Sequence, residues 1–260
     1  MFLLMLILLP VYTGIFYHFV LHYYWAIPIN ILIAIVLDIL TIVLVLVLAL
    51  PIVKVQKIDN KFKYYYVRSI LRFALKMIRV KCSYEGLENL PKDTPYVLFP
   101  NHKSYVDVLV LYVMANRPIT FISKPENFKI PLVGLYMKYI GCIGLNRNDD
   151  REAAKAIIQG IKVVKAGEPI IIFPEGGIKS RTDEKMIDIK AGAYKLATKP
   201  MAPVVPVTLI GMTKIKDNAP FKKTKVKCII HQPINYEEYK DLNTHELGQK
   251  VFDIVNSKIE

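Results

Sequence analysis

Two side chains able to move a proton lie five residues apart in the stretch PNHKSYVD, which spans residues 100–107. His102 carries the ring that most often serves as a general base near neutral pH. A carboxylate such as that of Asp107 can hold the ring in one tautomer by accepting its other ring proton. No serine or cysteine stands at a nucleophile elbow, so the pair predicts direct activation of a substrate hydroxyl.

The same stretch also has a purely structural interpretation. Ser104, followed three residues later by Asp107, fits a capping box at a helix N-terminus, in which Asp107 satisfies backbone N–H groups. A histidine followed five residues later by an aspartate also occurs by chance about 0.2 times in a chain of this composition. The pair can do both jobs, so residues elsewhere must decide.

A second polar turn follows an apolar run in the stretch IIIFPEGGIKSR. Glu175 stands at the end of the predicted strand, and Gly176 and Gly177 allow a close approach of the backbone. Lys179 and Arg181 add positive charge to the same turn.

A third turn, GCIGLNRND, ends a predicted strand at Arg147. In sheets whose strands alternate with helices, sites gather where the strands run into the helices. Three such strand ends carry a histidine–aspartate pair, an arginine, and a glycine turn with cations. Together they predict an anion-binding site with a base inside it.

Strands and helices alternate from about residue 80 onward. Short apolar runs such as YVLF, ITFIS and PIIIF are separated by segments with helical patterns, among them residues 105–115 and 150–165. This alternation predicts an α/β domain with a mixed, mostly parallel sheet flanked by helices.

Two apolar segments precede this domain. Residues 1–53 contain no lysine or arginine and one acidic residue, Asp38. The segment 29–50 is long enough to cover a bilayer core of roughly 30 Å. Since there is no charged leader and a second apolar segment follows at once, we expect an uncleaved membrane hairpin rather than a signal peptide. Asp38 needs a partner or a shallow position in lipid, which leaves both a spanning and a shallow hairpin open.

Residues 54–79 form a basic, amphipathic stretch that links the hairpin to the domain expected over residues 80–260. One helical stripe is basic and consists of Arg68, Arg72, Lys76 and Arg79. A second stripe is apolar and consists of Phe62, Tyr66, Ile70, Phe73 and Met77. Such a helix either lies on the membrane surface or is an ordinary domain helix with a solvated basic face.

The charge of the chain is concentrated after the hairpin. All 35 basic residues lie from Lys54 onward, against all but one of the 22 acidic residues, so that part carries +14. This charge favours an anionic membrane surface as partner, and a small acidic carrier protein or a phosphorylated substrate fits as well. No nucleic acid is expected, because no recognisable binding motif accompanies the basic residues.

The basic residues just after the hairpin also predict its orientation. Lys54, Lys57, Lys61 and Lys63 crowd this flank, and basic flanks stay inside. We therefore expect a protein of the cell membrane with its catalytic domain on the cytoplasmic side. The three cysteines are odd in number and widely spaced, as is typical of a reducing compartment.

The turns occur in the order of the block motifs of the glycerophospholipid acyltransferases. NHKSYVD resembles the Asn-His-x-Ser-x-x-Asp block, GCIGLNR the second block, FPEG the third and VVPV the fourth. SKPENFKIPLVG resembles the lysine-containing link between the first two blocks, and IKAGAYKLA the stretch before the fourth. The resemblance covers about residues 80–235. The chain's length is similar to that of the bacterial 1-acylglycerol-3-phosphate acyltransferases, which often carry an N-terminal membrane helix pair.

The resemblance implies a glycerol-3-phosphate acyltransferase-like fold and a division of roles. His102 would be the general base and Asp107 its orienter, while Arg147, Glu175 and Lys124 would hold the glycerol phosphate of the substrate. The implied reaction transfers an acyl chain from a thioester of acyl-carrier protein or coenzyme A to the free 2-hydroxyl of lysophosphatidate. The product is phosphatidate, and neither a metal nor a further cofactor is implied.

The third block departs from the family pattern Phe-Pro-Glu-Gly-Thr-Arg-Ser. Gly176 is retained and is expected to approach the substrate, but Gly177 and Ile178 stand where the family has threonine and arginine. Lys179 or Arg181 is expected to supply the missing cation. The departure leaves glycerol 3-phosphate or another lysolipid open as acceptor. A membrane-tethered lipid-binding protein with an altered site is the alternative from another class.

Overall fold

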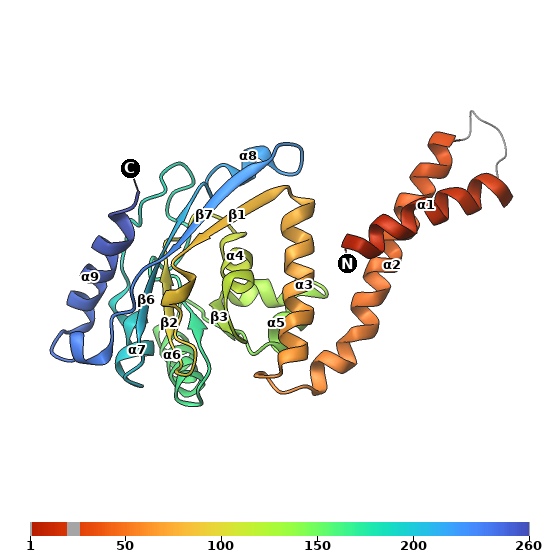
Figure 1. Ribbon diagram of the computed structural model, residues 1–260. Coiled ribbons are helices and arrows are strands. Elements are labelled where there is room, and N and C mark those ends of the chain that lie inside the picture. The colour runs from red at the N-terminus through yellow and green to blue at the C-terminus, as the bar shows by residue number, and fades with distance from the viewer. Residues whose placement is uncertain (1, 20–26, 260) are drawn as a thin grey trace. The chain divides into compact units, whose positions relative to one another are not determined.

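The structure is a computed structural model and describes residues 2–19 and 27–259 (Figure 1). The chain divides into two compact units, of which the first ends at Gln56 and the second begins at Lys57.

The smaller unit is a pair of apolar helices, α1 (Phe2–Phe19) and α2 (Ile27–Val55). Among the described helices, α2 alone is long and apolar enough to cross a bilayer, by length and composition, and α1 is a shorter apolar helix. A signal sequence or the core helix of a soluble protein passes the same test. Only 11% of the apolar window of α2 is buried, however, which is low for a core helix.

The two helices of this unit pack on each other through a polar contact as well as apolar ones. The hydroxyl groups of Tyr12 and Thr41 are hydrogen-bonded at 2.9 Å. Asn30, Ala34 and Asp38 follow one another at every fourth residue of α2 and are buried. The Oδ1 atom of Asp38 has no hydrogen-bond partner among the described residues.

The larger unit is built on a seven-stranded sheet of order β1-β7-β6-β2-β5-β3-β4. The strands are β1 (Val80–Glu85), β2 (Val97–Pro100), β3 (Thr120–Ser123), β4 (Ile143–Gly144), β5 (Ile170–Ile171), β6 (Val204–Ile210) and β7 (Thr224–Ile230). Every pair of neighbours is parallel except β6 and β7. The predicted mixed, mostly parallel sheet is confirmed.

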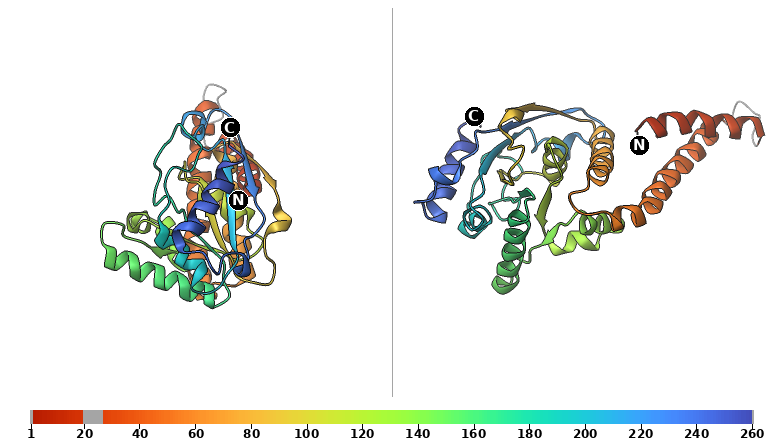
Figure 2. Two further views of the ribbon diagram at one scale, coloured as in Figure 1. Left: turned by 90° about the vertical axis from the view of Figure 1, so that its left-hand side faces the viewer. Right: turned by 60° about the horizontal axis from the view of Figure 1, so that its bottom comes forward.

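Helices cover both faces of this sheet (Figures 1 and 2). The α-helices are α3 (Lys61–Met77), α4 (Asp107–Met114), α5 (Val133–Tyr139), α6 (Asp150–Lys165), α7 (Lys195–Thr198), α8 (Ile215–Asn218) and α9 (Thr244–Asn256). The short 3₁₀ helices are η2 (Leu87–Asn89), η3 (Pro125–Lys129), η4 (Ala191–Tyr194) and η5 (Tyr236–Glu238). One apolar core lies between the sheet and helices α3, α4 and α5, and a second lies between the sheet and helices α6, α7 and α9.

The centre of the sheet sets the position of the site. All four residues of β2 are buried, as expected of a strand covered on both faces. Strands β3, β4, β5 and β6 run in the same direction as β2 and therefore end at the same edge of the sheet. The polar turns identified in the sequence follow these strand ends, so the fold brings them together at one edge.

Helix α3 belongs to the larger unit. Tyr64, Val67 and Leu75 are buried in the core that α3 shares with α4, and the Tyr64 hydroxyl donates to the backbone carbonyl of Ala115. Helix α3 is therefore a helix of the domain, and its contact with a membrane surface stays a prediction. The boundary expected after residue 53 lies after Gln56, and the linker expected over residues 54–79 does not form a unit of its own, because α3 supplies part of the core of the larger unit.

The stripe of α3 that faces this core differs from the apolar stripe singled out in the sequence. The expected stripe lies at the edge of the core and partly outside it, since Phe62 is 61% exposed and Met77 is 42% exposed. The buried residues Tyr64, Val67 and Leu75 lie on the neighbouring stripe. Helix α3 therefore packs against α4 and still leaves apolar side chains on the surface.

Candidate active site

The structure brings the ring of His102 and the carboxylate of Asp107 into contact, with Nδ1 and Oδ2 2.8 Å apart. β2 ends at Pro100 and α4 begins at Asp107, so the intervening turn folds the ring back over the first turn of the helix. The Asp107 side chain is fully buried, and that of His102 is 15% exposed. A buried carboxylate thus supports an imidazole that still reaches solvent.

This contact determines which ring nitrogen is free. Oδ2 of Asp107 also accepts hydrogen bonds from the backbone N–H groups of Lys103 at 2.6 Å and Ser104 at 3.0 Å. Because Oδ2 acts as an acceptor, Nδ1 of His102 carries the proton and donates it. In the neutral ring with this tautomer, Nε2 carries no proton and can take one from a substrate. The ring also stacks on Phe173, with centroids 3.9 Å apart.

Asp107 therefore serves both roles that the sequence left open. It orients His102 and satisfies two backbone N–H groups of the turn. The reciprocal half of the expected capping box is absent, since the Ser104 hydroxyl accepts from the N–H of Val106 at 3.2 Å rather than from that of Asp107.

An ion pair lies directly behind this turn. Lys103 Nζ is 3.1 Å from Glu175 Oε2, and neither side chain has exposed surface. Glu175 Oε1 accepts from the backbone N–H of His102 at 2.7 Å, and Oε2 also accepts from that of Ile187 at 3.3 Å. Glu175 thus joins the His102 turn to the loop that follows β5.

The position of Glu175 does not fit the substrate contact that the resemblance implied. Its side chain is absent from the cavity wall and fully buried, and its oxygens are occupied by Lys103 and two backbone N–H groups. We assign Glu175 to positioning the catalytic turn. The sequence did not single out Lys103, because no local pattern distinguishes a buried lysine from an exposed one. Its buried partner, Glu175, lies 72 positions away.

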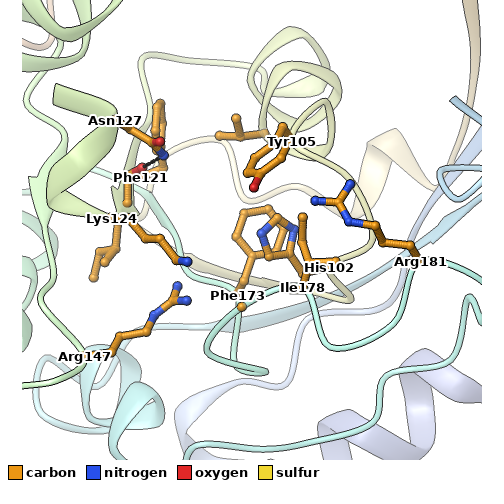
Figure 3. Close-up of a pocket in the computed structure, with 13 residues that line it drawn as sticks. His102, Tyr105, Phe121, Lys124, Asn127, Arg147, Phe173, Ile178 and Arg181 are labelled. Atoms are coloured by element: carbon orange, nitrogen blue, oxygen red, sulfur yellow. Dashed lines mark hydrogen bonds between the residues drawn. The ribbon is translucent and has the colours of Figure 1, made fainter. Parts of the chain in front are cut away.

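A cavity of about 160 Å³ opens over His102 (Figure 3). Its wall is formed by His102, Tyr105, Val108, Phe121, Ile122, Ser123, Lys124, Asn127, Arg147, Phe173, Gly177, Ile178 and Arg181. Lys124, Arg147 and Arg181 extend toward it from three different loops. None of these wall residues is acidic, so the cavity favours a negatively charged ligand beside the base.

Arg147 lies against Gly177, one of the two positions that depart from the family pattern. Gly177 has φ +155°, and a Cβ atom there would lie 2.8 Å from Nη1 of Arg147. A side chain at position 177 would therefore require the guanidinium to shift. Although much of the side chain is exposed, partial desolvation lowers the pKa of Arg147 from its ordinary value, and an arginine remains charged at neutral pH. No ion pair joins Arg147 to a described acidic residue.

The structure separates the two cations expected to replace the missing arginine. Arg181 lines the cavity, with its guanidinium 5.1 Å from the centre of the Tyr105 ring. Lys179 does not line it and lies 3.6 Å from a carboxylate oxygen of Asp188. Gly176 also lies outside the wall, at a turn where its φ of +71° favours glycine.

Apolar wall residues were the ones that sequence reasoning missed. The run IIIF indicated a buried strand, but not that the ring of Phe173 would stack on His102. Tyr105 lies within the recognised motif, yet its position opposite Arg181 depends on a loop 76 residues further along. Among the described residues, no group of three or more His, Cys, Asp or Glu side chains is placed to hold a metal ion.

The fold and the site together define an α/β domain in which a hydrogen-bonded histidine–aspartate pair lies beside a cationic cavity. The model of the Acyltransferase family matches residues 81–210, half of the chain, and the protein belongs to this family.

Relatives and a solved structure support this membership. The 1-acyl-sn-glycerol-3-phosphate acyltransferase of Bacillus subtilis is 32% identical over 66% of this chain and 83% of its own length. The chloroplast enzyme BAT2 of Brassica napus is 36% identical over 68% of this chain. The chain spans about half the length of BAT2 and of the similar chloroplast enzymes, 51% in the case of BAT2. The crystal structure of PlsC from Thermotoga maritima, a 1-acyl-sn-glycerophosphate acyltransferase, matches with a TM-score of 0.66 and 28% identity, over 76% of this chain and 78% of that one.

Proposed function

We propose that the protein transfers an acyl chain from an acyl thioester to the free 2-hydroxyl of lysophosphatidate, making phosphatidate for phospholipid biosynthesis. The observation that carries the proposal is the cavity in which Lys124, Arg147 and Arg181 surround His102 and whose wall contains no acidic residue. A phosphate monoester carries between one and two negative charges at neutral pH. The named relatives with this family's domain act on 1-acyl-sn-glycerol 3-phosphate, by their names.

The reaction follows from the free Nε2 of His102. Nε2 takes the proton of the 2-hydroxyl as its oxygen attacks the thioester carbonyl carbon, and Asp107 stabilises the imidazolium that forms. Collapse of the tetrahedral intermediate breaks the carbon–sulfur bond, and the imidazolium returns the proton to the leaving thiolate. The products are an ester and a free thiol, and His102 is regenerated.

The cations of the cavity hold the acceptor while this occurs. An arginine binds a phosphate with two parallel hydrogen bonds, whereas a lysine acts as a point charge. Arg147 and Arg181 are therefore the principal phosphate contacts in this proposal, with Lys124 as the third. The thioester donor is acyl-carrier protein or coenzyme A.

The same proposal assigns the protein to the cell membrane. Helix α2 is long and apolar enough to cross a bilayer, and lysines follow it directly at Lys54 and Lys57. Basic flanks remain on the cytoplasmic side, so the catalytic unit lies there. A reporter fused to the C-terminus should be active only in a cytoplasmic assay, and an exported reporter would contradict this orientation.

A single assay tests the activity. Purified full-length protein in detergent is given labelled lysophosphatidate with either donor, and in parallel glycerol 3-phosphate or a lysolipid without a phosphate monoester. We expect phosphatidate from lysophosphatidate and much slower acylation of the other acceptors. Equal rates on an acceptor that lacks the phosphate would overturn the proposed substrate.

A further inference from the structure

A strip of apolar and aromatic side chains lies on the surface of the larger unit. It consists of Phe62, Tyr66, Tyr136, Val133 and Ile130, and is called the α3–α5 strip here. Phe62 is 61% exposed, Val133 50% and Ile130 48%, while the two tyrosines are half-buried between them. Helix α5 lies beside the N-terminal part of α3 (Figure 1), and Tyr66 of α3 contacts Tyr136 of α5.

Direct contacts join the aromatic residues of the strip. The rings of Phe62 and Tyr66 are stacked, with centroids 6.4 Å apart. Tyr66 in turn meets Tyr136, with hydroxyl oxygens 3.3 Å apart. Val133 lies three residues before Tyr136 in α5 and so shares its face of the helix.

The turn that presents the end of the strip is held in a strained conformation. Leu132 has φ +63°, which is rare for a residue with a Cβ atom. Gly134 packs so closely on Phe128 that a Cβ atom would lie 2.0 Å from the Phe128 carbonyl oxygen, and its N–H donates to the carbonyl of Ile130 at 2.8 Å. The backbone is therefore fixed with Ile130 and Val133 pointing outward.

Positive charge surrounds the strip. Segments 57–62 and 124–138, which carry most of it, contain five lysines and two acidic residues, Asp59 and Glu126. Among the described residues, none of these lysines forms an ion pair. An apolar and tyrosine-rich strip with lysines around it has the composition of a surface that lies in the boundary between lipid headgroups and acyl chains.

The chain connects Phe62, the first residue of the strip, to the end of α2 through a short segment. Phe62 lies seven residues after Val55, the last residue of α2. Seven extended residues span at most about 25 Å. A protein partner at this surface would therefore compete with the membrane for it, whereas the lysines favour an anionic bilayer.

The strip also continues into the wall of the cavity. Lys124 and Asn127 line the cavity, and Ile130 follows three residues later, at the end of η3. The Asn127 side chain is fixed by a hydrogen bond to the Ser123 hydroxyl at 2.9 Å. The segment 124–133 therefore forms the cavity wall at one end and the strip at the other.

We propose that the α3–α5 strip is the surface through which the catalytic unit contacts the headgroup boundary of an anionic bilayer. This contact places η3 at the membrane, so that a lysophospholipid can bring its phosphate and hydroxyl into the cavity while its acyl chain stays in lipid. The proposed route for the substrate rests on the proposed function, whereas the membrane contact does not.

Tryptophan fluorescence in bilayers tests the contact directly. Trp25 is the single tryptophan of the chain, so a W25F background allows one reporter at a time. Full-length F62W and V133W are reconstituted in vesicles containing anionic lipid, with and without brominated acyl chains. F221W is the matched control, because Phe221 is 82% exposed but lies in the loop before β7.

Quenching by the brominated chains is expected for F62W and V133W and not for F221W. Solvent-like, unquenched emission from F62W and V133W would overturn the proposal, and quenching of F221W alone would assign the contact to another face. Phe62→Ser combined with Val133→Ser should also raise the KM for lysophosphatidate presented in anionic vesicles by about tenfold. The KM for a short-chain, water-soluble lysophosphatidate should not change.

Assays with lysophosphatidate in vesicles and with the short-chain, water-soluble lysophosphatidate distinguish a failure of this proposal from a failure of the proposed function. If the wild-type protein acylates neither, the proposed function fails, and the quenching experiment still decides the membrane contact. If it acylates both and the double variant behaves as wild type in vesicles, the strip does not contact the bilayer. Equal melting temperatures of the variant and the wild type in detergent would show that the fold is retained.

Discussion

Replacing Lys103 by methionine should destabilise the protein and displace the turn that carries His102. We expect this although Lys103 is not part of the cavity wall. The substitution keeps an unbranched side chain of similar length and removes the charge. Glu175 is then left without exposed surface and without its cation. Removing one partner of a buried ion pair typically costs about 3–5 kcal/mol.

The remaining contacts of Glu175 set the magnitude at the lower end of this range. Its carboxylate keeps the backbone N–H groups of His102 and Ile187 as donors, and these still stabilise the charge in part. We therefore expect a loss of about 3 kcal/mol. For a unit of about 200 residues this corresponds to a fall in Tm of roughly 6–12 °C.

Activity should fall as well, because Glu175 holds the backbone of His102 itself. A misplacement of a catalytic group by about 1 Å can cost roughly 10²-fold in rate. We expect kcat of Lys103→Met to fall by about that factor at a temperature where the variant is folded, with a smaller change in the KM for the acceptor.

A double-mutant cycle distinguishes the pair from a general effect of substitution in the core. Glu175→Gln alone leaves the Lys103 ammonium unpaired, and the double variant removes both charges. We expect the double variant to lose less stability than the sum of the two single losses, by at least about 1 kcal/mol. Melting in detergent by circular dichroism and steady-state kinetics measure these effects. A Lys103→Met protein with wild-type Tm and kcat would refute the reasoning.

Three further predictions concern the base, the cations and pH. His102→Ala should lower kcat by about 10² to 10⁴ with folding intact, and a near wild-type rate in detergent would remove His102 from the mechanism. Arg147→Ala and Arg181→Ala should raise the KM for lysophosphatidate but not the KM for the thioester. Lys179 is a nearby cation outside the cavity, so Lys179→Ala should change neither KM. A raised KM for lysophosphatidate in Lys179→Ala alone would assign the phosphate contact to Lys179. Burial, with a contribution from Lys258, lowers the pKa of His231 below its ordinary 6.5. The unfolded chain therefore gains a proton as pH falls through about 6.5 while the folded chain does not, which lowers stability. His231→Gln can still donate to the Thr208 hydroxyl and should lose less Tm than the wild type between pH 7.5 and 5.5; an equal loss would contradict this account.

The sequence by itself identified the features that depend on short stretches of chain. The alternation of apolar runs and helical segments was enough for the mixed, mostly parallel sheet. The five-residue spacing of His102 and Asp107 was enough for their contact, because a single strand-to-helix turn closes it. The apolar pair of helices was visible because residues 1–53 hold almost no charge.

Only the tertiary structure decided the roles of residues whose partners lie far away in the chain. Glu175 became a positioning residue because Lys103 and His102, more than 70 positions earlier, occupy its oxygens. Arg181 and Lys179 are equivalent cations in sequence, and they were separated by Tyr105 at the cavity and Asp188 outside it. Burial and charge pairing depend on which segments meet across the sheet, and short-range sequence patterns do not contain that information.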